Sequence, residues 1–142
     1  MDGLWTRIWA WLFRRPPAPL GERGEVAAAR YLRRKGYTIV ARQAREGYGE
    51  LDLVAVDHGV VVFVEVKTRQ SDLAGHPAEA VDLDKQRRLT RAALAFLRRH
   101  HLLDHPVRFD VVAVRWPARA RRPVIDHIPH AFEPPGQGQF FA

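Results

Sequence analysis

The chain has 142 residues, 46% hydrophobic and 27% charged, which is typical of a folded domain with one core. Lys and Arg number 23 against 16 Asp and Glu, and the formal net charge of +7 suits a partner rich in phosphates. The absence of cysteine excludes a disulfide framework, a thiolate zinc site and a cysteine nucleophile.

Residues 1–20 are expected to be an extension outside the main domain, with the stretch PPAP as a stiff linker. Arg14 and Arg15 follow the apolar stretch, which is the reverse of the charge order in a secretory signal. No apolar run approaches the roughly 18 residues of a spanning helix, so a cytoplasmic location is expected. Two interpretations stay open: a helix that frays or packs on its own domain, and an amphipathic element that binds a protein partner or a membrane surface. The apolar side of that helix would consist of Leu4, Trp5, Ile8, Trp9, Trp11 and Leu12.

Residues 21–132 are expected to form one α/β domain, a mixed sheet flanked by helices. In chain order, the patterns predict a helix from Gly21 to a cap at Gly36, a strand over 37–45, two strands within 49–69, a helix after Asp82 or Asp84, an apolar strand over 107–116 and a shorter one within 123–132. Residues 133–142 have no periodicity and are expected to be a flexible tail.

The segment 49–69, GELDLVAVDHGVVVFVEVKTR, contains acids within aliphatic runs and is predicted to be a β-hairpin. Residues 58–59, His-Gly, offer a two-residue turn because glycine tolerates positive φ. In that register Asp57 pairs with Val60, and Asp52 lies directly opposite Glu65. Facing carboxylates repel unless a proton or a cation lies between them, and Mg²⁺ prefers oxygen ligands of this kind.

The same register places Glu50 opposite Lys67, on the face that carries Asp52 and Glu65. Lys67 would therefore point at the space between the acids, where it could orient a water or offset charge on a phosphate. A simple ion pair at a strand end is the structural alternative. The opposite face is expected to be wholly apolar, with Leu51, Leu53, Ala55, Val62, Val64 and Val66.

Both predicted helices carry basic residues that could contact a nucleic-acid backbone or simply face solvent. No element resembles a helix that reads bases, so selectivity for shape is expected. His127 and His130 have no evident third ligand and are interpreted as structural. The candidate contacts with nucleic acid are Arg30, Arg34, Lys85, Arg88 and Arg91.

An acid, a spacer and Glu-x-Lys on adjacent strands resemble the core of the PD-(D/E)xK nuclease superfamily. The chain resembles most closely the YraN-like family of uncharacterised, predicted endonucleases, and more distantly the archaeal Holliday-junction resolvases. The matching pieces run from Gly21 to Phe132 and are GERGEVAAARYL, GELDLVAVD, VFVEVKTR, DKQRRL, RFDVVAV and HIPHAF.

This resemblance implies a restriction-endonuclease-like fold with an αβββαβ core. It also implies a site in which Asp52 and Glu65 bind Mg²⁺ or Mn²⁺, Lys67 is catalytic, and Glu25 on the first domain helix completes the acidic set. Glu50 and Gln86 are candidates for supporting positions beside the ligands. Gln43 stands where the family usually has Asn.

The leading hypothesis is therefore a divalent-metal-dependent endonuclease that cleaves DNA, selective for structures such as branches. Nucleases with this core often work as dimers, so a homodimer is a further expectation. The alternative hypothesis is a catalytically silent nucleic-acid-binding or scaffold module that keeps the nuclease fold. A third hypothesis is a membrane-associated adaptor that acts through the Trp-rich start.

Overall fold

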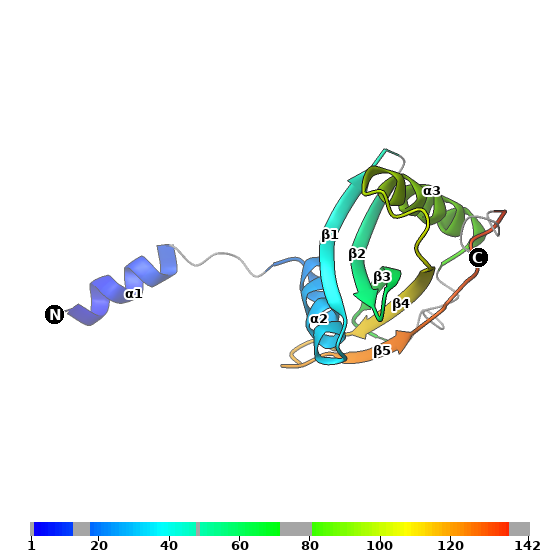
Figure 1. Cartoon of the computed structure of the whole chain (residues 1–142). Coiled ribbons are helices and arrows are strands. Elements are labelled where there is room, and N and C mark those ends of the chain that lie inside the picture. The colour runs from blue at the N-terminus through cyan, green and yellow to red at the C-terminus, as the bar shows by residue number, and fades with distance from the viewer. Residues whose placement is uncertain (1, 13–17, 48, 72–80, 137–142) are drawn as a thin grey trace.

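The computed structural model describes residues 2–12, 18–47, 49–71 and 81–136. It confirms an α/β fold, in which one five-stranded sheet has the strand order β1-β2-β3-β4-β5 (Figure 1). Neighbouring strands are antiparallel except β3 and β4, which are parallel and are joined through α3. The elements are α1 (Asp2–Leu12), α2 (Leu20–Arg34), β1 (Thr38–Glu46), β2 (Gly49–Asp57), β3 (Val60–Arg69), α3 (Leu83–Arg99), β4 (Val107–Arg115) and β5 (Val124–Ile128).

The hairpin register is confirmed over the part nearest the turn. Asp57 pairs with Val60, and the pairing continues to Leu53 and Val64. Both turn residues, 58 and 59, have positive φ, at 48° and 80°, which matches the twist of a tight two-residue hairpin. Local turn chemistry is therefore enough to align these two strands.

The two helices of the domain cover opposite faces of the sheet (Figure 1). On β3, Val61 and Phe63 pack with α3, whereas Val62 and Val64 pack with α2. This alternation is the period of a strand that is buried on both sides. The α3 side buries Leu89, Ala92, Ala93, Phe96 and Leu97, and the α2 side buries Ala28, Ala29 and Leu32.

The prediction for Leu51 is wrong. It was assigned to the face of Leu53, yet it packs in the α3-side cluster with Val54, while Leu53 packs on the α2 side. The strict alternation of side chains between the two faces of β2 therefore fails around Asp52. On the neighbouring strand β1, Gln43 has a φ of 48°, outside the extended region, and β2 leaves its pairing with β3 after Leu53. The local irregularity turns Leu51 onto the other face.

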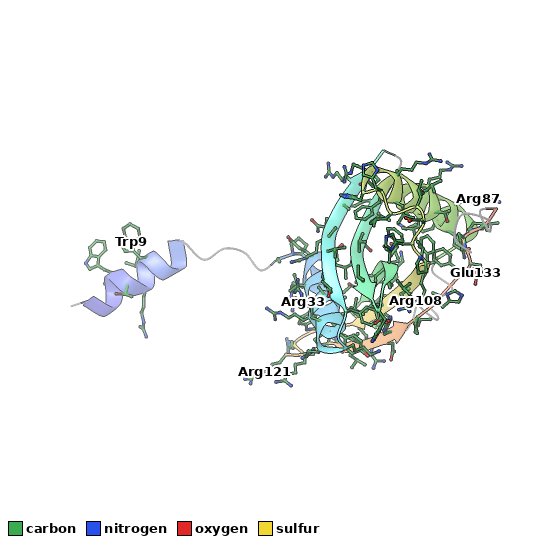
Figure 2. All side chains as sticks on the ribbon, viewed as in Figure 1. Trp9, Arg33, Arg87, Arg108, Arg121 and Glu133 are labelled. Atoms are coloured by element: carbon green, nitrogen blue, oxygen red, sulfur yellow. The ribbon has the colours of Figure 1, made fainter. Side chains whose placement is uncertain are left out.

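The N-terminal segment forms the helix α1, and Figure 2 shows Trp9 projecting from it. Its exposed apolar side chains are Leu4, Trp5, Ile8 and Trp9. Docking of this helix on a partner or a membrane surface stays a prediction. None of the helices in the described ranges has the length and apolar character needed to cross a bilayer. Residues 13–17 of the expected linker and 137–142 of the expected tail lie outside the described residues.

Candidate active site

Asp52 and Glu65 meet where β2 and β3 separate. Beyond the last backbone pair, the Val66 N–H donates to Asp52 Oδ2 at 2.9 Å, so the carboxylate occupies the place of a strand acceptor. The Glu65 side chain is only 5% exposed, and its Oε2 is buried without a hydrogen-bond partner. A buried carboxylate oxygen without a donor is costly, so this arrangement calls for a proton or a cation.

The pKa of Asp52 reflects the same unfavourable burial of two neighbouring carboxylates. Burial raises the pKa of this carboxyl, and the adjacent charge of Glu65 raises it further, from an ordinary 3.8 to about 7, although the hydrogen bond from Val66 acts in the opposite direction. With this pKa, the carboxyl of Asp52 exchanges its proton around neutral pH, and a divalent cation could displace that proton.

Two lysines flank the other oxygen of Glu65. Lys67 Nζ lies 3.5 Å from Glu65 Oε1, and Lys85 Nζ lies 3.4 Å from the same atom. Lys67 lies beside Glu65 as predicted, but its predicted pairing with Glu50 is absent from the described strands, because β2 and β3 pair only as far as Leu53 and Val64. Lys85 was placed among candidate contacts with nucleic acid, and its approach to the acids was missed. The sequence of residues 72–80, between β3 and α3, does not indicate where the first turn of α3 packs against the sheet, so the approach of Lys85 to Glu65 could not be predicted.

Glu25 reaches the acidic end of the sheet from α2. Its Oε2 accepts a hydrogen bond of 2.9 Å from Gln43 Nε2, so Gln43 orients this acid. Burial raises the pKa of Glu25; the Gln43 bond lowers it, and the charges of Asp52 and Glu50 raise it again. Glu25 therefore belongs electrostatically to the same cluster.

The close approach of α2 to the sheet depends on Gly24. A Cβ atom at this position would collide with the side chain of Thr68 on β3. Only glycine lets the helix backbone approach that strand so closely, and the next residue along the helix is Glu25.

An open cavity of about 310 Å³ lies between β2 and the start of α3. Its lining combines acids from the strand with cations from the helix: Gly49, Glu50, Asp52, Lys85, Arg88 and Leu89. Gln86 has a different contact, since its Nε2 donates to the Val81 carbonyl at 3.0 Å and so fixes the beginning of α3. Arg30, Arg34 and Arg91 are exposed on the helices.

The donor set fits a hard divalent cation. Among the described residues, no three His, Asp or Glu side chains are close enough together to form a complete metal cage. Mg²⁺ seldom uses such cages; one or two carboxylates, waters and a substrate phosphate are its usual ligands. Asp52 and Glu65 would supply the carboxylates, and the Oε2 of Glu65 that lacks a donor is the atom that a cation would satisfy.

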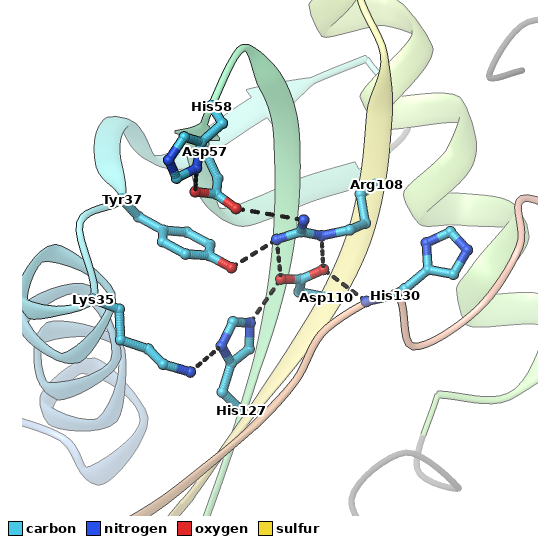
Figure 3. Close-up of polar contacts among 8 residues, drawn as sticks. All are labelled: Lys35, Tyr37, Asp57, His58, Arg108, Asp110, His127 and His130. Atoms are coloured by element: carbon cyan, nitrogen blue, oxygen red, sulfur yellow. Dashed lines mark hydrogen bonds and ion pairs between the residues drawn. The ribbon is translucent and has the colours of Figure 1, made fainter.

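A second polar cluster, centred on Asp110, was missed because β4 reads as apolar. Asp110 is fully buried and accepts hydrogen bonds from Arg108 Nε at 2.8 Å, His127 Nε2 at 2.7 Å and the His130 N–H at 2.9 Å (Figure 3). Arg108 also donates to the Tyr37 hydroxyl at 2.7 Å. Because its oxygens are fully used, this cluster has the properties of a structural network, which agrees with the interpretation of His127.

Known proteins similar to this chain share most of its length. A model for the "Uncharacterised protein family UPF0102" matches residues 24–114. A UPF0102 protein of Rhodopirellula baltica is 48% identical over 127 residues, covering 87% of this chain and 76% of the relative. One from Symbiobacterium thermophilum is 54% identical over 95 residues, covering 67% and 80%. Another, from Nocardia farcinica, is 49% identical over 113 residues, covering 80% and 88%.

Proposed function

The chain belongs to the uncharacterised protein family UPF0102, and from that premise we propose that it is a divalent-metal-dependent endonuclease that hydrolyses DNA phosphodiester bonds. The observation that carries the proposal is the pair Asp52 and Glu65, two partly or fully buried carboxylates that face each other beside the ammonium of Lys67. Buried like charges are retained where a ligand compensates them. The order of motifs that resembles the PD-(D/E)xK nucleases supports the same assignment.

In this proposal Asp52 and Glu65 hold the metal, and Glu25 supports them through the charge that it adds to the cluster. A bound Mg²⁺ or Mn²⁺ would supply Lewis-acid stabilisation and a more acidic water. Lys67 lies beside Glu65 and would orient the attacking water or offset the charge that develops on the phosphate.

DNA is the proposed substrate because the site lies beside basic helices. Exposed arginines occur on the outer sides of both α2 and α3, among them Arg33 and Arg87 in Figure 2. Together with the net charge of +7, they suit contacts with a phosphate backbone, which carry no sequence information. Selectivity for DNA structure rather than sequence follows from this proposal.

The test is cleavage of linear, single-stranded, flapped and four-way-junction DNA with Mg²⁺ or Mn²⁺, with EDTA as the control. We expect metal-dependent cleavage with a preference for one structure. Binding of every DNA in the panel without cleavage would contradict the proposed endonuclease activity and favour a catalytically silent binding module of the same fold.

Metal affinity is expected to rise with pH in the range around neutrality. With a pKa of about 7, Asp52 is mostly protonated at pH 6 and mostly ionised at pH 8, so the proton competes with the metal at the lower pH. Titration calorimetry should show Mn²⁺ binding about tenfold tighter at pH 8 than at pH 6, with proton release. Asp52→Asn should abolish this dependence, whereas Asp126→Asn, an exposed site on β5, should keep it. Equal affinity of the wild type at both pH values would contradict the role of Asp52.

A further inference from the structure

We propose that Lys85 is a second active-site lysine that contacts the phosphodiester from the α3 side, with Arg88 extending the same contact. This inference rests on the proposed function and adds the group that binds the substrate phosphate. Its basis is the position of Lys85, which lies 3.4 Å from Glu65 Oε1 and lines the cavity next to Asp52.

The first turn of α3 is held firmly, so the position of Lys85 is well defined. Asp82 caps the helix, and its Oδ1 accepts a hydrogen bond of 2.8 Å from the Lys85 N–H. Gln86 Nε2 donates to the Val81 carbonyl from the same turn. A backbone fixed at two points presents the Lys85 side chain to the acids with little loss of entropy, as a site that binds ligand requires.

The cavity has one acidic wall and one basic wall. Glu50 and Asp52 stand on the β2 side, and Lys85 and Arg88 stand on the α3 side, one helical turn apart. At roughly 30 Å³ for each water, a volume of about 310 Å³ has room for a phosphate group together with its hydration. The acidic wall can bind a metal cation, and the basic wall can bind a phosphate oxygen. A phosphodiester with a bound metal ion therefore complements both walls.

Lys85 is also able to change partners. Its side chain is 31% exposed, whereas that of Glu65 is 5% exposed, so the ammonium reaches the cavity while the carboxylate stays buried. Glu65 Oε1 keeps Lys67 at 3.5 Å when Lys85 turns to a phosphate. A lysine suits this task because its flexible stem carries a compact charge that several oxygens can share.

The test compares Lys85→Ala with Arg98→Ala, which removes one positive charge from an exposed site in the last turn of the same helix. Binding of a synthetic four-way junction and of a linear duplex is measured with Ca²⁺ and with EDTA. We expect Ca²⁺ to increase the DNA affinity of the wild type and of Arg98→Ala, and this Ca²⁺-dependent gain in affinity to fall at least about tenfold in Lys85→Ala. Lys85→Arg should restore part of the gain. Thermal unfolding of each variant, with Lys85→Gln as a second neutral substitution, checks that the fold is kept.

Single-turnover cleavage in Mg²⁺ separates this inference from the proposed function. We expect Lys85→Ala to cleave about 10²-fold more slowly than Arg98→Ala. Cleavage that requires Lys67, with Lys85→Ala equal to Arg98→Ala in both assays, would overturn the role of Lys85 and leave the nuclease intact. A Ca²⁺-dependent gain in DNA affinity that requires Lys85, without DNA cleavage by any variant, would support the contact of Lys85 with phosphate and reject the proposed nuclease activity. Absence of any Ca²⁺-dependent gain in the wild type would overturn the inference.

Discussion

Lys67→Ala is expected to lower the single-turnover rate of DNA cleavage about 10²–10³-fold, the usual cost of removing one group that stabilises charge in a transition state. Its ammonium lies 3.5 Å from Glu65 Oε1, beside the pair that would hold the metal. DNA affinity should change little, because in the proposed complex the exposed arginines of the helices would supply most of the contacts with the backbone. Cleavage is measured with enzyme in excess over labelled DNA, and affinity by titration in Ca²⁺.

Asp52→Asn is the companion variant, with an equal or larger loss of rate expected. The pKa of Asp52 is raised on folding, so its ionised form disfavours the folded state; in the absence of metal the variant should therefore be more stable than the wild type at pH 8. An inactive but more stable protein would separate loss of chemistry from loss of fold. Arg121→Ala, an exposed charge between β4 and β5, serves as the matched control for Lys67→Ala. Full activity in either Asp52→Asn or Lys67→Ala would reject the mechanism.

Asp110→Ala is expected to lower the free energy of unfolding by about 3–5 kcal/mol, as when one partner of a buried charged network is removed. The variant leaves Arg108 and His127 without the carboxylate that both contact at 2.7–2.8 Å. Denaturant unfolding measures the change. Asp126→Ala, exposed on the neighbouring strand β5, should stay within about 0.5 kcal/mol of the wild type. A similarly small change for Asp110→Ala would contradict the structural role of the network.

Asp110 also determines how the stability of the fold is expected to depend on pH. Burial raises the pKa of Asp110, but hydrogen bonds from His127, from Arg108 and from the His130 amide outweigh it, and the pKa is lowered overall. A lowered folded-state pKa contributes stability above the unfolded value of about 3.9, and this contribution is lost as pH falls through the folded value. The wild type should therefore lose more stability than Asp110→Ala when the pH is taken from 7 into that acid range. Parallel loss in both proteins would contradict this account.

Predictions that depended on neighbouring residues agree with the structure. Asp82, one of the two predicted capping residues, caps α3, and Gly36 follows α2 with a φ of 96°. The turn at residues 58–59 aligned β2 with β3, and from that register alone Asp52 was expected near Glu65. Turn and cap preferences act through backbone torsions and hydrogen bonds over a few residues, so a single sequence is enough to read them.

Predictions that depended on distant packing failed or were not made. The strand period assigned Leu51 to the wrong face, because the irregularity beside it involves Gln43 on another strand. Asp110 was read as part of an apolar strand, although its partners come from β4, β5 and the turn beyond β5. No pattern within a single segment can reveal side chains that meet only after several segments pack.

By itself, the sequence of this protein determined the α/β class, the hairpin and the facing acids, since each follows from local period and turn chemistry. The tertiary structure alone decided that Lys85 joins Lys67 at Glu65, that Gln43 orients Glu25, and that Asp110 links β4 to β5. The physical reason is that these contacts depend on where α2 and α3 come to rest on the sheet. That placement is set by close packing of whole faces, such as the contact of Gly24 with Thr68, and not by any short stretch of the chain.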